Sequence, residues 1–229
     1  MLRKFIFAAA CLAGFMPMAA RAAASVLQEY NEAVRAKPDL ERGAELFRNC
    51  AACHGPATRS RSDVDDVPRI AGQHFRVLVR QLVDYRHSTR WDIRMEHIAG
   101  HVLGDAHDIA SVAAYASELT RDRPRSVGSG DSVDRGARLY TQRCATCHRP
   151  AGEGDDSRLI PRLAGQHYEY LLRQMYDAVD GRRPAFPLEH VRLLARLQRD
   201  DLVGVADFLA RSEWAGPKEP DAAADAAAH

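Results

Sequence analysis

Apolar residues recur along this 229-residue chain at the three- and four-residue spacing of amphipathic helices, and the pattern occurs twice. The first copy has Phe75, Leu78, Val79 and Leu82, followed by Ile109, Val112, Ala113, Ala116 and Leu119. The second copy has Tyr168, Leu171, Leu172 and Met175, followed by Leu202, Val205 and Leu209. The pattern predicts an all-α fold, in which Asp39 and Asp134 are the expected N-caps of the first helix of each copy.

The N-terminus has the pattern of an export signal. A short basic start and an apolar stretch over 5–15 precede several small residues. This order predicts a secretory signal peptide over 1–24, with cleavage after Ala22 or Ala24 and a periplasmic mature protein. No apolar run reaches the roughly 18–20 residues of a membrane span, which excludes a polytopic membrane protein.

Composition and charge narrow the class of protein further. The chain is 46% hydrophobic and 28% charged, as is usual for a soluble globular protein. The full chain carries a net charge of +1, and loss of the three basic residues of the signal peptide leaves 29 basic against 31 acidic residues. Nucleic-acid binding is not expected, because it usually requires a strongly basic surface.

The cysteines carry the strongest chemical signal. Cys11 lies in the signal peptide, and the other four belong to two motifs, CAACH at 50–54 and CATCH at 144–148. Two cysteines separated by two residues and followed by histidine are typical of c-type haem attachment, although a structural zinc site is the main alternative. The prediction is two covalently bound haem c groups, on Cys50, Cys53, Cys144 and Cys147. His54 and His148 are the expected proximal iron ligands.

The repeat extends beyond the haem motifs. ERGAELF at 41–47 matches DRGARLY at 134–140, and PRIAGQHF at 68–75 matches PRLAGQHY at 161–168. From the second motif onward the two copies are offset by a constant 93 residues. The chain is therefore predicted to contain two copies of one helical domain.

Composition suggests where the domains begin and end. The first domain is expected over 25–120 and the second over 133–214. The segment 121–132 is rich in proline, glycine and serine and is predicted to be a linker. The tail at 215–229 is predicted to be disordered, and residues 25–38 are expected to form a loosely attached helical arm.

With these motifs the chain resembles the dihaem cytochrome c4 family of bacterial periplasmic class I cytochromes, over about 39–213. The matching features are the two haem motifs, the two AGQH turns and the aromatic pairs Phe47 with Tyr115 and Tyr140 with Phe208. The resemblance implies two tandem class I cytochrome c domains that pack face to face and pass electrons between two haems. It also implies close helix crossings at Gly43 and Gly136, and proline carbonyls of Pro68 and Pro161 that orient the proximal histidines.

The two copies differ at the sixth iron ligand, which is usually a methionine sulfur in class I cytochromes. Met95 and Met175 are the two methionines of the predicted mature chain. Met95 follows His54 by 41 residues, where the family places its ligand, and is the predicted sixth ligand of the first haem. The equivalent residue of the second copy is Leu188, which cannot bind iron.

Three ligations of the second haem are compatible with the sequence. His190, two residues beyond Leu188, is the tentative ligand; an open or water-bound position and Met175 are the alternatives. The first copy has His97 at the position of His190 beside a competent Met95, which counts against His190. Met175 lies on the apolar face of its helix. Both leading ligations predict a lower reduction potential for the second haem than for the first.

Arginine dominates the basic residues near the expected ligand loops. Arg90, Arg94, Arg182 and Arg183 flank these loops, where guanidinium groups suit haem propionates and solvated surface equally well.

The favoured function is electron transfer between a respiratory donor and a terminal oxidase or reductase, without a bound substrate. The expected donor is a quinol-oxidising complex or a dehydrogenase, and association with the membrane is expected only through such partners. One alternative is a haem enzyme that acts at an open second haem, peroxidase-like or sulfur-anion oxidising. The other is an electron-transfer subunit of a dehydrogenase complex. The carrier is favoured because haem attachment explains almost every informative residue.

Overall fold

The computed structural model describes residues 18–55, 67–120 and 126–213. Within these ranges the chain forms ten helices and one isolated β-bridge, between Asp155 and Ile160. The predicted all-α fold is therefore confirmed.

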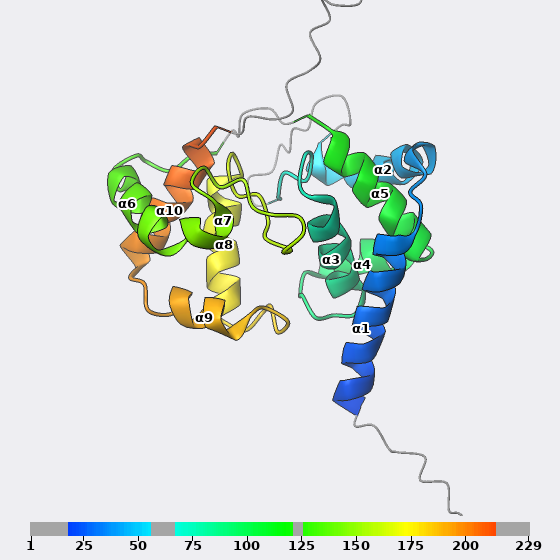
Figure 1. Ribbon diagram of the computed structural model, residues 1–229. Helices are drawn as coiled ribbons and strands as arrows, with labels where there is room; N and C mark the ends of the chain where they lie inside the picture. Colours follow the sequence, from blue (N-terminus) through cyan, green and yellow to red (C-terminus); the bar gives the residue numbers. More distant parts are fainter. Residues whose placement is uncertain (1–17, 56–66, 121–125, 214–229) are drawn as a thin grey trace, which may run out of the picture.

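The helices form two groups that lie side by side (Figure 1). The first group contains α1 (Met18–Arg35), α2 (Leu40–His54), α3 (Phe75–Arg86), α4 (Ile93–His101) and α5 (Ala106–Glu118). The second contains α6 (Val133–Arg143), α7 (Ala145–His148), α8 (Tyr168–Val179), α9 (Leu188–Leu194) and α10 (Arg199–Arg211). The predicted disordered tail at 215–229 and the first 17 residues of the predicted signal peptide lie outside the described residues.

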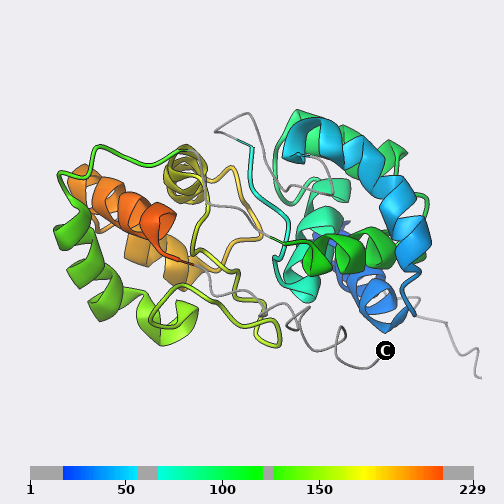
Figure 2. The same ribbon diagram turned by 90° about the horizontal axis from the view of Figure 1, so that it is seen from above.

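The sequence repeat is also a structural repeat. At the offset of 93 residues, α3 corresponds to α8, α4 to α9 and α5 to α10, and the short helices α6 and α7 together take the place of α2. Viewed from above, the two groups are separate, and loops of both meet between them (Figure 2).

In each domain the first and last helices cross at a glycine. A Cβ atom on Gly43 of α2 would lie closer than 3.0 Å to the Ser111 carbonyl of α5, and one on Gly136 of α6 would meet the Gly204 carbonyl of α10 equally closely. An aromatic pair packs beside each crossing: the ring centroids of Phe47 and Tyr115, and those of Tyr140 and Phe208, are 5.4 Å apart. The expected crossings and aromatic pairs are confirmed.

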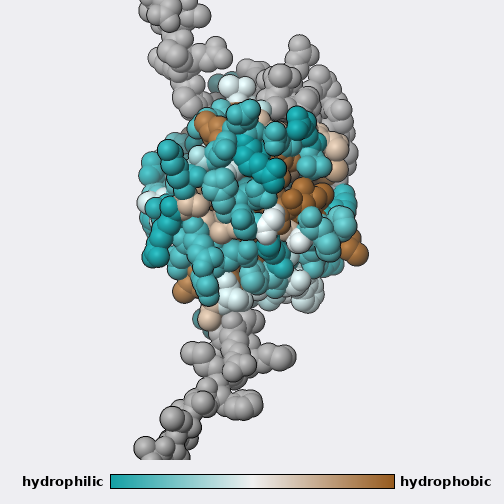
Figure 3. Space-filling view, turned by 90° about the vertical axis from the view of Figure 1, so that its right-hand side faces the viewer, coloured by the Kyte–Doolittle hydropathy of each residue, from teal (hydrophilic) through white to brown (hydrophobic). Residues whose placement is uncertain are grey.

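The helix α1 is not the loosely attached arm that the sequence suggested. Val26, Tyr30 and Ala33 are buried in the core of the first domain. The Glu29 carboxylate accepts from Arg86 at 3.2 Å and from His87 at 2.7 Å, both at the end of α3. The prediction was wrong because the sequence shows that these apolar residues share one helix face but does not show which surface that face covers. With α1 in place, the outer face of this domain is mainly hydrophilic (Figure 3).

Of the two predicted helix caps, the first is confirmed and the second is wrong. Asp39 caps α2, and its side chain accepts from the Arg42 amide. Asp134 is not a cap: α6 begins one residue earlier, at Val133, and its N-cap is Ser132. The carboxylate of Asp134 instead lies in the first turn, where it is favourable for the helix dipole.

The second half of the predicted linker is tied to the second domain. The amides of Gly128 and Gly130 each donate to the Asp207 carboxylate of α10 at 2.8 Å. Asp207 also pairs with Arg211 at 2.8 Å. Residues 121–125 lie outside the described residues.

The two domains are joined by a reciprocal pair of glutamines from the AGQH turns. Gln166 accepts from the Arg69 amide at 2.8 Å and donates to the Arg69 carbonyl at 2.9 Å. Gln73 makes the same two bonds to Arg162, both at 2.9 Å. The domains therefore face each other, as the resemblance implied, and because Gln73 and Gln166 are equivalent in the repeat, these contacts are related by an approximate twofold axis.

The glycine crossing gives a stability prediction. Replacing Gly43 with alanine (G43A) forces α2 away from α5, and overpacking of this kind costs about 1–3 kcal/mol. Denaturant unfolding of the haem-loaded protein should show this loss. The matched control is Gly100→Ala, because nothing lies within 4 Å of a Cβ there and alanine favours the helix. Equal stability of both variants would contradict the close crossing.

A second prediction concerns acid stability. Asp108 on α5 accepts from Arg42 of α2 at 2.9 and 3.1 Å, and this pairing holds the pKa of Asp108 below its usual value. A lowered folded pKa stabilises the protein above the unfolded pKa of about 4, and this stabilisation is lost as the pH falls. Asp108→Asn should therefore lower stability at pH 7 and flatten its decline below pH 5. The same decline of stability with falling pH in Asp108→Asn and in the native protein would contradict this role of the pair.

Candidate haem sites

The first CxxCH motif occupies the last turns of α2. Cys50 and His54 are four residues apart and therefore share one face of the helix. His54 is buried, and its Nδ1 donates to the Pro68 carbonyl at 2.7 Å. Burial lowers the pKa of His54 and favours neutral imidazole. The bond to Pro68 leaves Nε2 as the atom with a free lone pair, which is what a proximal iron ligand requires.

The second motif spans the junction of α6 and α7 and repeats this arrangement. His148 is buried at the end of α7, and its Nδ1 donates to the Pro161 carbonyl at 3.3 Å. Burial again lowers the pKa of the imidazole. The expected proline carbonyls are therefore present in both copies, with the longer bond in the second.

The four cysteines fit thioether attachment better than a zinc site. None forms a disulfide in the structure, and burial raises the pKa of Cys50 and Cys144 to about 11, so both thiols are protonated at pH 7. Among the described residues, the cluster of potential metal ligands comprises Asp105, His107 and Asp108 and includes no cysteine. Two of its members already have partners, because Asp105 caps α5 and Asp108 pairs with Arg42.

Met95 lies in the first turn of α4. The Asp92 side chain caps this helix and accepts from the amides of Arg94 and Met95. The charges of Asp92 and Arg94 both act on the pKa of His54, so the start of α4 is near the proximal histidine. Met95 is partly buried there.

In the second domain, His190 of α9 faces the proximal histidine. The ring centroids of His148 and His190 are 6.0 Å apart, with 49° between the ring planes. Burial, and then the nearby His148 and Arg183, lower the pKa of His190 to about 4, so its imidazole is neutral at pH 7. Met175 instead packs among the apolar residues of the core, and the Leu188 side chain is 58% exposed.

The equivalent histidine of the first domain behaves differently. His97 is exposed and stacks on His101 one turn later, with ring centroids 4.7 Å apart. The residue equivalent to His101 in the second domain is Leu194, which is buried, so His190 has no stacking partner of that kind. The shared sequence position of His97 and His190 therefore does not imply a shared role.

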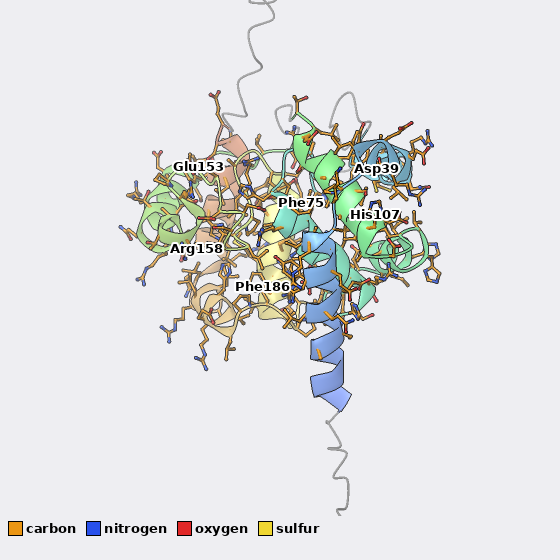
Figure 4. The ribbon with its side chains drawn as sticks, turned by 45° about the vertical axis from the view of Figure 1, so that its right-hand side comes forward. Asp39, Phe75, His107, Glu153, Arg158 and Phe186 are labelled. Carbon is orange, nitrogen blue, oxygen red and sulfur yellow. The ribbon has the colours of Figure 1, made fainter. Side chains whose placement is uncertain are left out.

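An aromatic residue that the sequence reasoning missed supports His190. Phe186, in the loop before α9 (Figure 4), stacks on His190 with ring centroids 4.8 Å apart and 25° between the planes. The Arg183 guanidinium lies over the Phe186 ring, 4.2 Å from its centroid. The equivalent residue in the first copy is Ile93, which is 85% exposed. Phe186 could be identified from the sequence by comparing the two copies position by position, because an aromatic residue stands there where the first copy has an aliphatic one.

Two of the four flanking arginines lie together at the domain interface, where Arg90 is buried and Arg183 is partly buried. Arg90 is 6% exposed and donates to Gln81, to Tyr170 at 2.9 Å and to Gln174 at 2.5 Å. Arg183 donates to Gln81 at 3.3 Å, and burial together with the positive Arg90 lowers its pKa to about 10. The hydrogen-bond partners of both guanidinium groups among the described residues are neutral.

The other two flanking arginines are paired with acids. Arg94 lies 3.4 Å from the Asp92 carboxylate, and Arg182 lies 3.2 Å from that of Asp177. Arg90 and Arg183, by contrast, hydrogen-bond to neutral partners, which favours binding of an anion, and haem propionates have the required charge and oxygen acceptors.

A family model described as cytochrome c matches residues 40–119 and 133–211, which is more than half of the chain. Cytochrome c4 of Thiocapsa roseopersicina is 30% identical over 172 residues, covering 70% of this chain and 85% of that protein. The chain belongs to the cytochrome c4 family. The crystal structure of reduced recombinant cytochrome c4 from Pseudomonas stutzeri has the same fold, with a TM-score of 0.68 and 24% identity. That match covers 77% of this chain and 100% of the other.

A second kind of relative is also similar to the chain. The thiosulfate dehydrogenase electron acceptor of Stutzerimonas stutzeri (strain A1501) is 30% identical over 171 residues, covering 70% of this chain and 77% of that protein. None of the helices in the described ranges has the length and apolar character of a membrane span.

Membership of the cytochrome c4 family gives the chain its cofactor and its general activity. The motifs at 50–54 and 144–148 fit two covalently bound haems, and the protein is a dihaem electron-transfer cytochrome. The helix α1 precedes the first segment that the cytochrome c family model matches, which begins at residue 40.

Proposed function

We propose that this chain is a periplasmic electron carrier in which the two haems have different sixth ligands. The first haem is bound by His54 and Met95, and the second by His148 and His190. The 6.0 Å separation of the His148 and His190 rings is the observation that carries this proposal.

This separation is the one that an iron between two imidazoles would require. An imidazole nitrogen bound to a metal lies about 2 Å from it, and the ring centroid lies about 1 Å further out. Two imidazoles on opposite faces of one iron therefore have centroids about 6 Å apart. His148 and His190 have this spacing, and Phe186 supports the His190 ring from the side.

The different ligands set different potentials. When bound, haem supplies one-electron chemistry between the ferric and ferrous states. A methionine sulfur raises the reduction potential of a haem, and histidine does not. Met95 therefore gives the first domain the higher potential, so electron transfer from the second domain to the first is downhill.

The two interface arginines suit the same sites. Arg90 and Arg183 would hold propionate oxygens at the domain interface, where their positive charges would compensate the propionate charge. Their neutral partners Gln81, Gln174 and Tyr170 fix the two guanidinium groups in place without neutralising them.

The proposed partners are a quinol-oxidising complex or dehydrogenase as donor and a terminal oxidase or reductase as acceptor. The similarity to a thiosulfate dehydrogenase electron acceptor favours a second candidate, an electron-accepting subunit of a dehydrogenase. An enzyme that acts at the second haem would need an open iron position, and the placement of His190 argues against one.

Replacing His190 tests the second ligand. His190→Ala should convert the second haem from low to high spin and let the reduced protein bind carbon monoxide at one haem per chain, because the sixth position becomes open. Absorption spectra with and without carbon monoxide measure both effects. The matched control is His97→Ala, which removes the equivalent exposed histidine and should change neither spectrum. A His190→Ala protein with the native spectrum would contradict the assignment.

Replacing Met95 tests the origin of the difference in potential. Redox titration of the native protein should give two one-electron steps separated by more than about 120 mV, which is a hundredfold difference in electron affinity at about 59 mV per tenfold. Met95→His should bring the two steps together by lowering the higher potential. Met175→Leu is the control and should leave both potentials in place. An effect of Met175→Leu larger than that of Met95→His would refute the assignment of Met95.

A further inference from the structure

One helix face that is covered in the first domain is open in the second. In the first domain α1 packs on α3, and Val79 and Val83 of α3 are 0% exposed. The equivalent residues of α8, Leu172 and Tyr176, are only partly buried, and Val179 on the next turn is 38% exposed. The described residues contain no helix before α6 that corresponds to α1.

The open face of α8 is a shallow depression next to the domain interface. Its volume is about 460 Å³, and it is lined by Glu169, Leu172, Arg173, Tyr176, Asp177, Asp180 and Arg182. These positions repeat at three- and four-residue spacing along one side of α8 and continue into the following turn. At its far end, the Arg182 carbonyl accepts from the Trp91 amide of the first domain at 3.2 Å.

The first domain shows what kind of element covers such a face. The helix α1 places Val26, Tyr30 and Ala33 in the core, at positions i, i+4 and i+7 of one helix side. Its acidic Glu29 pairs with Arg86 and His87 of α3. An amphipathic helix with acidic flanks is therefore the complement of the α3 face.

Three positions that are basic on α3 are not basic on α8, and two of them are acidic, although Arg173 keeps the charge of Arg80 and Arg182 adds one. Arg86 is replaced by Val179, and His87 is replaced by Asp180. Arg76, at the other end of the α3 face, is replaced by Glu169. Arg182 pairs with both Asp177 and Asp180, at 3.2 and 3.8 Å, so two acids share one cation and this end of the face stays net negative. A helix that carried an acid at the place of Glu29 would therefore meet net negative charge instead of a basic pair, and like charges repel.

We propose that the α8 face binds an amphipathic helix of a partner protein. This helix has apolar residues at the spacing of α1 and a lysine or arginine where α1 has Glu29 and Glu32. The net negative charge at this end of the face disfavours α1 of a second copy of this chain. It also disfavours residues 215–229, which carry three acids and one lysine. The proposal goes beyond electron transfer and does not depend on which side chains bind the two irons.

The test uses two synthetic peptides with the sequence of residues 24–35, each held helical by a side-chain staple on the exposed side. One has the native sequence, and the other carries Glu29→Lys and Glu32→Lys. Both are labelled and titrated with the full-length, haem-loaded protein, and binding is followed by fluorescence anisotropy. The lysine peptide should bind at least tenfold more tightly than the native peptide.

Variants of the protein locate the binding to α8. Tyr176→Arg should weaken binding of the lysine peptide at least tenfold, and the matched control Leu27→Arg, on the exposed side of α1, should leave it unchanged. The double variant Val179→Arg with Asp180→His gives α8 the basic pair that Arg86 and His87 form on α3 and should reverse the preference, so that the native peptide binds better. Haem absorption checks that each variant has folded.

Three outcomes would overturn the proposal. The first is failure of the lysine peptide to bind, and the second is equal binding of both peptides. The third is dimerisation of the native protein that Tyr176→Arg abolishes, measured by sedimentation, because a second copy would then occupy the face.

Discussion

The hydrogen bond from each histidine of the two CxxCH motifs to a proline carbonyl lies in the turn on which both the proposed haem sites and the domain interface depend. Pro68 orients His54 at 2.7 Å, and Pro161 orients His148. The residue after each proline is held through its backbone by a glutamine of the other domain, as Gln166 holds Arg69. One short turn therefore orients both the imidazole proposed to bind iron and the neighbouring domain. A change in this turn would disturb the haem site and the interface together.

The two halves of the molecule keep this framework and differ in what surrounds it. The first domain offers Met95 and sends His97 outward onto His101. The second has Leu188 at the position of Met95 and turns His190 toward His148. Because the scaffold is shared, the proposed difference in potential arises from a few side chains on α4 and α9 rather than from the fold.

The sequence was sufficient to predict the helical class, the duplication and the two attachment motifs, because each depends on spacing within one segment. It also predicted the proline carbonyls and the glycine crossings through the family resemblance. It did not determine the orientation of His190, because that depends on Leu194 and Phe186, whose effect appears only when the helices are packed. The same limit applies to α1, since its apolar residues have meaning only against the α3 face that they cover.

The central claim is that one protein holds one haem with histidine and methionine and another with two histidines. Near-infrared magnetic circular dichroism of the fully oxidised, full-length protein tests it most directly, because the energy of the ferric charge-transfer band depends on both axial ligands. The account predicts two low-spin bands of equal intensity, one for each ligand pair. Two methionine-type bands, or a high-spin signal from one haem, would contradict it.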